Sequence, residues 1–358
     1  MPVSHRVAIV YAAYRTSEQY AVMLNRLAIV DAATGRNAPT LVDELPAAHG
    51  IAWTPDGNRL IVGRNTYGLN FDGLPTVAVC NADTLEVEPG WSWPSSPYVA
   101  RVAASDSHLA VYWSNGTLTV YAFASKTLVA TLTGISTAIE QMAWSPDGAY
   151  LAVAEQTKLT VFSATTWSAV VGAPTMAYAF PFAWSPDGSL LAIAQTQTGT
   201  TLRLYSVGDW TETVTGVTSP EYATAVTWTA DGSRIGIGLD ASPHLLVVSV
   251  PACVPQPVSM PSGVRTGNYT RVLMMPDGRV VVARDAPRRV SLIGRDLQTV
   301  EYDLHASRAE VQSITLSPWL DNGIAGTVRD ESDAPAAGRR VLAIHDASAT
   351  VVGTATTA

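Results

Sequence analysis

The sequence predicts an all-β protein, a seven-bladed β-propeller, and three observations lead to this fold class. A short turn phrase of the form Trp-Ser-Pro-Asp-Gly recurs about every 40 to 50 residues. Each copy lies between two apolar runs, so that it indicates a strand, a turn and a second strand. The two ends of the chain carry complementary fragments of one further repeat. Such a period, with several short strands in each unit, is typical of propellers.

The turn phrase has the chemistry of a tight hairpin. Proline presets φ at the second turn position, aspartate can accept hydrogen bonds from its own backbone, and glycine takes the position with φ above zero. The copies are Trp53-Thr-Pro-Asp56-Gly57, Trp144-Ser-Pro-Asp147-Gly148, Trp184-Ser-Pro-Asp187-Gly188, Trp228-Thr-Ala-Asp231-Gly232 and, with the tryptophan replaced, Met275-Pro-Asp277-Gly278. Since each aspartate belongs to a separate hairpin, we interpret these residues as turn formers and not as ligands of one ion.

A degenerate copy fills the long gap between the first two phrases. Asp56 and Asp147 are about two periods apart, and the segment around Asp106 keeps the strand, turn and strand without the Pro or the Gly. With this copy included, six internal repeats follow one another along the chain. Each repeat should therefore supply one blade.

One repeat shows the internal plan of a blade. Strands are expected at 139–145, 150–155, 159–163 and 168–172. The second strand of each repeat is small and apolar throughout, as in Leu151-Ala-Val-Ala154. Near-continuous apolar strands are typical of strands that are buried on both faces. We therefore expect the second strands to lie inside a stack of blades.

The two ends predict how the ring closes. Strands are expected at 7–12 and 27–31 and near 40–43, without a first strand, whereas 311–318 has the pattern of a lone first strand. A composite blade built from both ends leaves no open sheet edge. It brings the predicted number of blades to seven and sets the propeller domain at 1–320.

The segment 321–358 follows a different pattern. Strands are expected at 324–330, 340–345 and 350–356, in an arrangement that resembles the opening strands of transthyretin-like or carboxypeptidase-regulatory-like β-sandwiches. We interpret the segment as a partial β-sandwich. Either the sequence continues beyond it, or its strands complete a sheet with another chain.

The turn phrase followed by Leu-Ala-Val-Ala resembles the WD40-like repeats of TolB-type propellers, over roughly residues 5–318. The chain departs from true WD40 repeats, because no third strand ends in Trp-Asp and no Gly-His recurs. The resemblance therefore implies the fold, and the partner rules of the WD40 family are not carried over.

Composition argues against several function classes. Only 15% of the residues are charged, the net charge is −8 and no basic run occurs, so nucleic acid is not an expected partner. No apolar run is long enough for a membrane span, and the N-terminus lacks the pattern of a signal peptide. Cys80 and Cys253 could pair or could both be thiols, and the latter is favoured.

No catalytic or metal-binding constellation is recognisable. The six histidines are scattered, and the chain has no Cys-x-x-Cys, no Gly-x-Ser-x-Gly and no phosphate-binding loop. The sequence thus predicts no enzyme, no catalytic residue, no metal and no cofactor. Any function is expected in protein contacts made by the uneven loops between strands.

Two long loops, 14–23 and 64–74, and the nearby segment 89–98 are the expected contact surface, together with arginines of the last internal repeat. Exposed aromatic and arginine side chains are the usual hot spots of such surfaces. The candidate binding residues are Arg15, Tyr67, Phe71, Trp91, Trp93, Tyr98, Arg284, Arg288 and Arg289.

The favoured function is a non-enzymatic structural or interaction module present in several copies in a larger assembly. Propellers joined to small β-sandwiches resemble bacteriophage virion components, such as tail, fibre or capsid-attached proteins. That resemblance implies a virion location, and otherwise a cytoplasmic one. The alternatives are a periplasmic TolB-like propeller and a propeller lyase or hydrolase.

Overall fold

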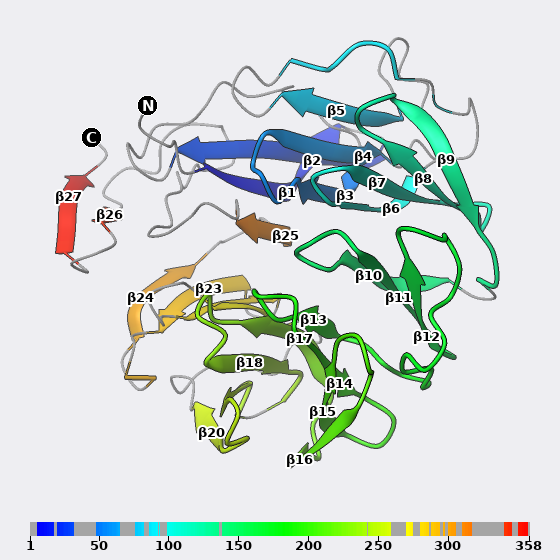
Figure 1. Cartoon of the computed structure of the whole chain (residues 1–358). Coiled ribbons are helices and arrows are strands. Elements are labelled where there is room, and N and C mark those ends of the chain that lie inside the picture. Colours follow the sequence, from blue (N-terminus) through cyan, green and yellow to red (C-terminus); the bar gives the residue numbers. More distant parts are fainter. Residues whose placement is uncertain are drawn as a thin grey trace. The chain divides into compact units, whose positions relative to one another are not determined.

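The computed structural model of the chain (Figure 1) consists of strands joined by turns, and no helix that could span a membrane is found in the part it describes. The described residues are 6–17, 20–31, 48–64, 76–81, 86–91, 93, 99–135, 138–241, 243–258, 270–274, 280–285, 288–293, 296–297, 300–305, 310–316, 340–345 and 350–356. The chain forms two compact units, the first from residues 1–102 and 306–358 and the second from residues 103–305. Each unit is built from antiparallel sheets.

In the first unit, one sheet is made from both ends of the chain. Its strand order is β2 (Tyr20–Asp31), β1 (Arg6–Ser17), β25 (Glu310–Leu316). Val7 of β1 lies opposite Leu316 of β25. The predicted pairing of the N-terminal segment with the strand at 311–318 is thereby confirmed.

The predicted loop at 14–23 is wrong. β1 and β2 continue pairing until Ser17 lies opposite Tyr20, and Arg15 lies opposite Val22 within this ladder. The segment is rich in Tyr, Thr, Val and Met, residues that suit a pleated surface, so the two strands extend well beyond the predicted 7–12 and 27–31. Arg15 is therefore a strand residue.

The first unit also contains a three-stranded sheet and a hairpin. The sheet has the order β3 (Ala48–Trp53), β4 (Arg59–Arg64), β5 (Val77–Asn81), and the hairpin consists of β26 (Arg340–His345) and β27 (Thr350–Thr356). The hairpin matches two of the three predicted C-terminal strands. The third, at 324–330, and the strand expected near 40–43 lie outside the described residues.

The remaining sheets run in chain order, each as a simple meander. They are β6 (Val99–Ala104), β7 (His108–Trp113), β8 (Leu118–Ala122) and β9 (Thr127–Leu132); β10 (Ile139–Trp144), β11 (Tyr150–Glu155) and β12 (Leu159–Ser163); β13 (Phe182–Trp184), β14 (Leu190–Gln195), β15 (Thr200–Ser206) and β16 (Glu212–Ser219); β17 (Ala223–Trp228), β18 (Arg234–Leu239), β19 (Leu245–Ser249) and β20 (Pro255–Val258); and β21 (Thr270–Met274), β22 (Val280–Asp285), β23 (Arg288–Ile293) and β24 (Val300–His305). β6 lies where the chain passes from the first unit to the second.

The sheet β6–β9 confirms the degenerate repeat, because its first turn lies at Asp106 and Ser107 between β6 and β7. The predicted strand at 168–172 is wrong: there the chain makes only one isolated bridge, between Phe162 and Ala169, which consists of two backbone hydrogen bonds. Val171 is 96% exposed, so this outermost segment has little packing to hold it in a longer ladder.

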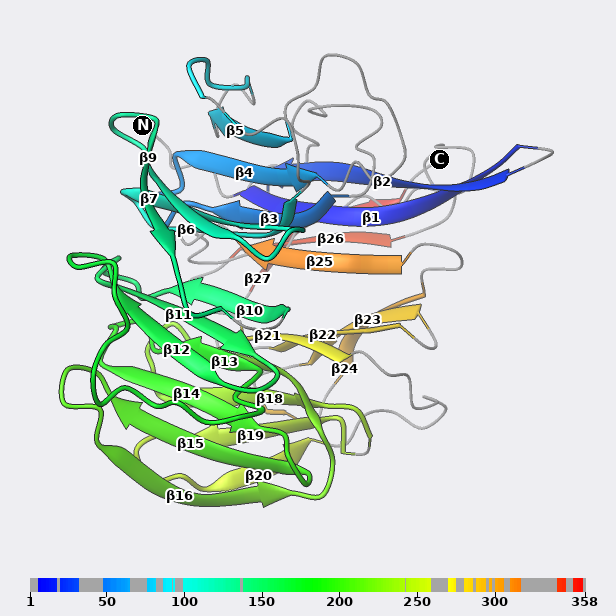
Figure 2. The ribbon, with the colours of Figure 1, turned by 90° about the vertical axis from the view of Figure 1, so that its right-hand side faces the viewer.

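The core of the second unit is formed by the second strands. The four residues Leu151–Ala154 of β11 and the four residues Leu191–Ala194 of β14 have no exposed surface, which confirms the prediction that these strands are buried on both faces. Figure 2 shows β14, β15 and β16 in that order toward the outside of the unit. Burial falls in the same direction, since most residues of β16 are exposed.

Close approach of neighbouring sheets explains one inner glycine. A Cβ atom on Gly236 of β18 would lie 2.8 Å from Sδ of Met274, which belongs to β21 of the next sheet. Only glycine leaves room for that side chain. The inner strands of successive sheets therefore pack face to face, and their turns are presented at the sheet ends.

Candidate functional site

The turn phrases of the second unit lie together at one end of its sheets. In an antiparallel meander, the turn after the first strand and the turn after the third strand lie at the same end of the sheet. In the turn between β13 and β14, Ser185 Oγ donates to Asp187 Oδ1 at 2.6 Å and accepts the N–H of Leu190 at 2.9 Å. The N–H of Ser189 donates to the same carboxylate at 3.0 Å. The hydroxyl and the carboxylate therefore close the turn.

Such hydrogen bonds lower the pKa of two of the turn aspartates. The side-chain hydrogen bond from Ser185, followed by those from Ser189, lowers the pKa of Asp187 below its ordinary value of 3.8. Hydrogen bonds from Thr229 and then Ser233 likewise lower the pKa of Asp231. Among the described residues no group of three or more His, Cys, Asp or Glu side chains is placed to hold a metal. Backbone hydrogen bonds within the turns confirm four of the repeated aspartates as turn formers, Asp56, Asp147, Asp187 and Asp231, and Asp277 lies outside the described residues.

A second repeat lies at the same end of the sheets, in the turns after the third strands. One residue in each turn adopts a left-handed backbone, with φ between 53° and 58°. In four of these turns its N–H donates to the carbonyl four residues earlier, as in the bond from Trp210 to Ser206. The series is Lys126, Trp167, Trp210, Cys253 and Leu297. The sequence analysis missed it, although Trp167 and Trp210 stand about one period apart.

Where a tryptophan occupies this position, it completes a cluster of three rings between neighbouring sheets. Between sheets β10–β12 and β13–β16, Tyr150 stacks on Trp184 with centroids 6.4 Å apart, and Trp210 meets both rings edge-on. His108 stacks in the same way on Trp144, and Trp167 again meets both. We call the contact between sheets β6–β9 and β10–β12, with His108, the first step. We call the contact between sheets β10–β12 and β13–β16, with Tyr150, the second step.

The first-strand tryptophans also join the sheets by hydrogen bonds. The indole N–H groups of Trp144, Trp184 and Trp228 donate to carbonyls of the preceding sheet, those of Ala103, Ala143 and Ala183, each at 3.1 Å. Every step thus repeats one geometry. A difference between steps must come from the side chains that surround the tryptophan.

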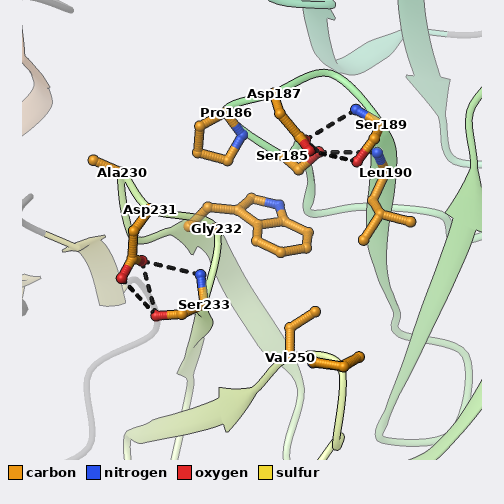
Figure 3. Close-up of a pocket in the computed structure, with 12 residues that line it drawn as sticks. Ser185, Pro186, Asp187, Ser189, Leu190, Ala230, Asp231, Gly232, Ser233 and Val250 are labelled. Carbon is orange, nitrogen blue, oxygen red and sulfur yellow. Dashed lines mark hydrogen bonds between the residues drawn. The ribbon is translucent and has the colours of Figure 1, made fainter.

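At the third step, between sheets β13–β16 and β17–β20, the two other rings are missing. Leu190 takes the place of Tyr150, and Cys253 takes the place of Trp210. A groove of about 390 Å³ lies here (Figure 3). Its lining comes from both sheets: Ser185, Pro186, Asp187, Ser189, Leu190, Trp228, Ala230, Asp231, Gly232, Ser233, Val250 and Pro251. Trp228 is 7% exposed, as buried as Trp144 and Trp184 beneath their rings, so the groove lies along the two turns and does not leave the indole face open.

The predicted contact residues are placed only in part. Trp91 and Trp93 are half-buried and stacked on each other, with centroids 5.0 Å apart. Tyr67, Phe71 and Tyr98 lie outside the described residues.

The three predicted arginines of the last internal repeat share one hairpin. Arg284 of β22 lies opposite Arg289 of β23, and Arg288 lies opposite Asp285. The backbone thus brings these arginines together. Arg15, in β1, lies within the first unit.

The two cysteines and one buried glutamate pack within the sheets and their connections. Cys80 is buried and Cys253 is half-buried, both are present as thiols, and burial raises the pKa of Cys253. Glu155 is fully buried at the end of β11, with Lys158 Nζ 3.7 Å from its Oε1. Lys158 also donates to the carbonyl of Gly134. The contacts of Lys158 therefore stabilise the connection between β11 and β12.

Comparison with known proteins agrees with this repeat architecture. The family described as "WD domain, G-beta repeat" matches residues 126–162, which run from β9 of one sheet through β12 of the next. No curated protein matches the chain. A chain in the "Crystal Structure of Mitotic Checkpoint Complex" is similar at a TM-score of 0.54 and 16% identity, over 74% of this chain and 82% of that one. At this identity the similarity concerns the fold.

Proposed function

We propose that the protein is a non-enzymatic interaction module built on a closed, seven-bladed β-propeller over residues 1–320, followed by a partial β-sandwich over 321–358. The described residues contain seven sheets of three or four strands. The sheet that combines β1 and β2 with β25 is the natural closing blade, because it uses both ends of the chain. A similar fold in a chain of a multi-protein complex supports an interaction role.

The observation that carries the proposal is the contrast between a rigid interior and aromatic side chains held outside the strands. The inner residues of β11 and β14 are fully buried, whereas Trp91 and Trp93 lie outside every strand and stack on each other while half-buried. Large aromatic groups on a rigid scaffold are the usual anchors of protein interfaces. We therefore propose that this tryptophan pair, with Arg15, Tyr67, Phe71, Tyr98 and the arginines 284, 288 and 289, contacts a partner protein.

The assembly is a further part of the proposal. The resemblance to virion components suggests several copies on a phage particle, and otherwise a cytoplasmic complex. This part rests on the resemblance alone and is separable from the interaction role.

The experiment is affinity capture of stoichiometric partners by the full chain from an extract of its native source. We expect Trp91→Ala/Trp93→Ala to weaken capture at least about tenfold, because aromatic hot spots carry most of the binding free energy. Val171→Ala is the matched control, since Val171 is 96% exposed and lies in the second unit. Equal capture by all three proteins, or turnover of a glycan by the purified chain, would overturn the proposal.

A further inference from the structure

Strand β9 is the outer edge of the sheet β6–β9 (Figure 1). Its sequence, Thr127-Leu-Val-Ala-Thr-Leu132, contains no charged residue, no proline and no glycine. Leu128 and Val129 of this strand are 51% and 40% exposed. An uncharged edge strand with exposed apolar side chains is a template for pairing with another strand.

The hydrogen bonds of the preceding hairpin show which way the backbone of β8 faces. The N–H of Trp113 donates to the carbonyl of Thr117 across the turn between β7 and β8. In an antiparallel ladder, bonded and non-bonded pairs alternate along the strands. Thr119 and Tyr121, two and four residues after Thr117, therefore bond to β7 and not to β9.

This alternation leaves two residues of β9 with outward backbone groups. Leu128 lies opposite Tyr121, and Thr131 lies opposite Thr119. Leu128 and Thr131 thus turn their N–H and C=O groups away from β8, and within the described residues no other strand pairs with β9. The outward residues are three apart because the pairing with β8 shifts at Val129, whereas in a regular strand they would be two apart.

Two other outer edges of the second unit are covered or interrupted. At β12, the segment that follows the strand returns along it, and the N–H of Val170 donates to the carbonyl of Val161 at 2.8 Å. At β16, Glu212 carries a charge that pairs with Arg203, and Gly216 has a left-handed φ of 68° that interrupts the extended backbone. These features oppose the addition of a further strand.

The two remaining outer edges of the unit carry prolines or charges. Pro255 and Pro257 of β20 have no N–H group to donate to another strand. The sequence of β24 contains Glu301 and Asp303. Among the outer strands that the structure describes in this unit, β9 thus has no covering segment, no proline and no charge.

We propose that β9 pairs with β9 of a second copy of the chain, antiparallel and about a two-fold axis, so that two four-stranded sheets join into one. A second copy has the same spacing of outward residues, so Leu128 of each copy can lie opposite Thr131 of the other without a further shift in register. Val129 would then lie opposite Ala130 of the other copy, which brings the exposed apolar side chains together.

The charge next to the strand is compatible with this register. Lys126 precedes β9, and the antiparallel arrangement places the two copies of Lys126 at opposite ends of the pair, roughly 20 Å apart at 3.3 Å per residue. The inference rests on the proposed interaction function, in which the chain occurs in several copies, and it names a second copy as one partner. It uses a different surface from the tryptophan pair.

The experiment follows the full chain by sedimentation velocity over about 10 µM to 1 mM. One strand edge is smaller than a standard interface, so we expect weak association, with the average mass rising toward that of a dimer across this range. Amide hydrogen exchange at Leu128 and Thr131 should slow several-fold from the lowest to the highest concentration, because their N–H groups become hydrogen-bonded in the dimer.

Two variants locate the contact. Val129→Lys places a charge on the edge, and Thr131→Pro removes an outward N–H without removing a bond to β8, so each should weaken dimerisation at least about tenfold. Val214→Lys is the matched control, because Val214 is 86% exposed on β16 and the change in charge is the same. It should alter dimerisation less than about twofold. Far-UV circular dichroism checks that each variant keeps its strands.

The inference is overturned if the chain stays monomeric at about 1 mM, if Val214→Lys weakens dimerisation as much as Val129→Lys, or if the dimer survives both β9 variants. A dimer that Trp91→Ala/Trp93→Ala abolishes and the β9 variants leave intact would also overturn it and would assign the contact to the tryptophan pair. Failure of the proposed function is judged by capture from the extract, so the two failures are distinguishable.

Discussion

The second and third steps of the second unit share one backbone plan and differ in two side chains. Both join their sheets through an indole N–H bonded to a carbonyl of the preceding sheet at 3.1 Å. At the second step Tyr150 and Trp210 complete a three-ring cluster, whereas Leu190 and Cys253 hold these positions at the third step, where a groove lies along the turns. The difference teaches that the repeat sets the geometry of the turn face, while individual residues decide where that face is open.

The largest effect is expected from opening the second step. Trp210 is 6% exposed, and Trp210→Ala should lower the free energy of unfolding by about 3–5 kcal/mol, the usual cost of truncating a buried tryptophan. Cys253→Ala at the matched position should cost about 1 kcal/mol or less, because it removes one atom from a half-buried site. Denaturant unfolding measures both. Equal losses would contradict the comparison of the two steps.

The next effect concerns the hydrogen bond that all three steps share. Trp184→Phe should cost about 1–3 kcal/mol, since it leaves the part-buried carbonyl of Ala143 without the indole donor. Trp53 is a natural control, because its buried Nε1 has no hydrogen-bond partner among the described residues. Trp53→Phe should therefore change the free energy of unfolding by less than about 1 kcal/mol. A loss at Trp53 as large as that at Trp184 would show that the indole bond is not what joins the sheets.

The smallest effect distinguishes the first step from the second. Burial lowers the pKa of His108 below its ordinary value of 6.5, and its Nδ1 lies 2.8 Å from Ser107 Oγ. The folded chain thus favours the neutral ring, so stability is lost as pH falls below 6.5 toward the folded pKa. We expect a lower denaturation midpoint at about pH 5.5 than at about pH 7.5.

Two variants exchange the residues that stack on the tryptophan at the first and second steps. His108→Tyr should remove its share of the pH dependence, and Tyr150→His should introduce a similar share at the second step, where the ring also stacks on a tryptophan. If His108→Tyr leaves the difference between the two midpoints unchanged, the stacked histidine is not its source.

The sequence predicted the strands of the sheets better than it predicted the groove between two of the sheets. The turn phrase fixes a hairpin by local chemistry, so β10 and β11 were found within a residue, and the lone strand that pairs with β1 was found within two. The loop expected around Arg15 failed because pairing in a long hairpin depends on cross-strand partners. The strand expected at 168–172 failed because an exposed edge segment has little packing.

The groove could not be predicted, because it arises from residues far apart in the sequence. Neither Leu190 nor Cys253 is unusual by itself. They stand out only when they are compared with Tyr150 and Trp210, which hold the equivalent positions at the neighbouring step. The binding role expected for the loops with Tyr67, Phe71 and Tyr98 stays a prediction. A search for a second period among Lys126, Trp167 and Trp210 could have revealed the left-handed turn position.

The measurement that tests the account most directly is the free energy of unfolding of Leu190→Tyr/Cys253→Trp. The double variant copies the second step onto the third, and the left-handed backbone at Cys253 (φ 53°) already matches that of Trp210 (φ 57°). If the groove is an unfilled place in the repeat, the new rings should raise the free energy of unfolding by about 0.5–2 kcal/mol, as cavity-filling substitutions do. A loss of stability by a similar amount would show that the third step has no room for them and would contradict the account.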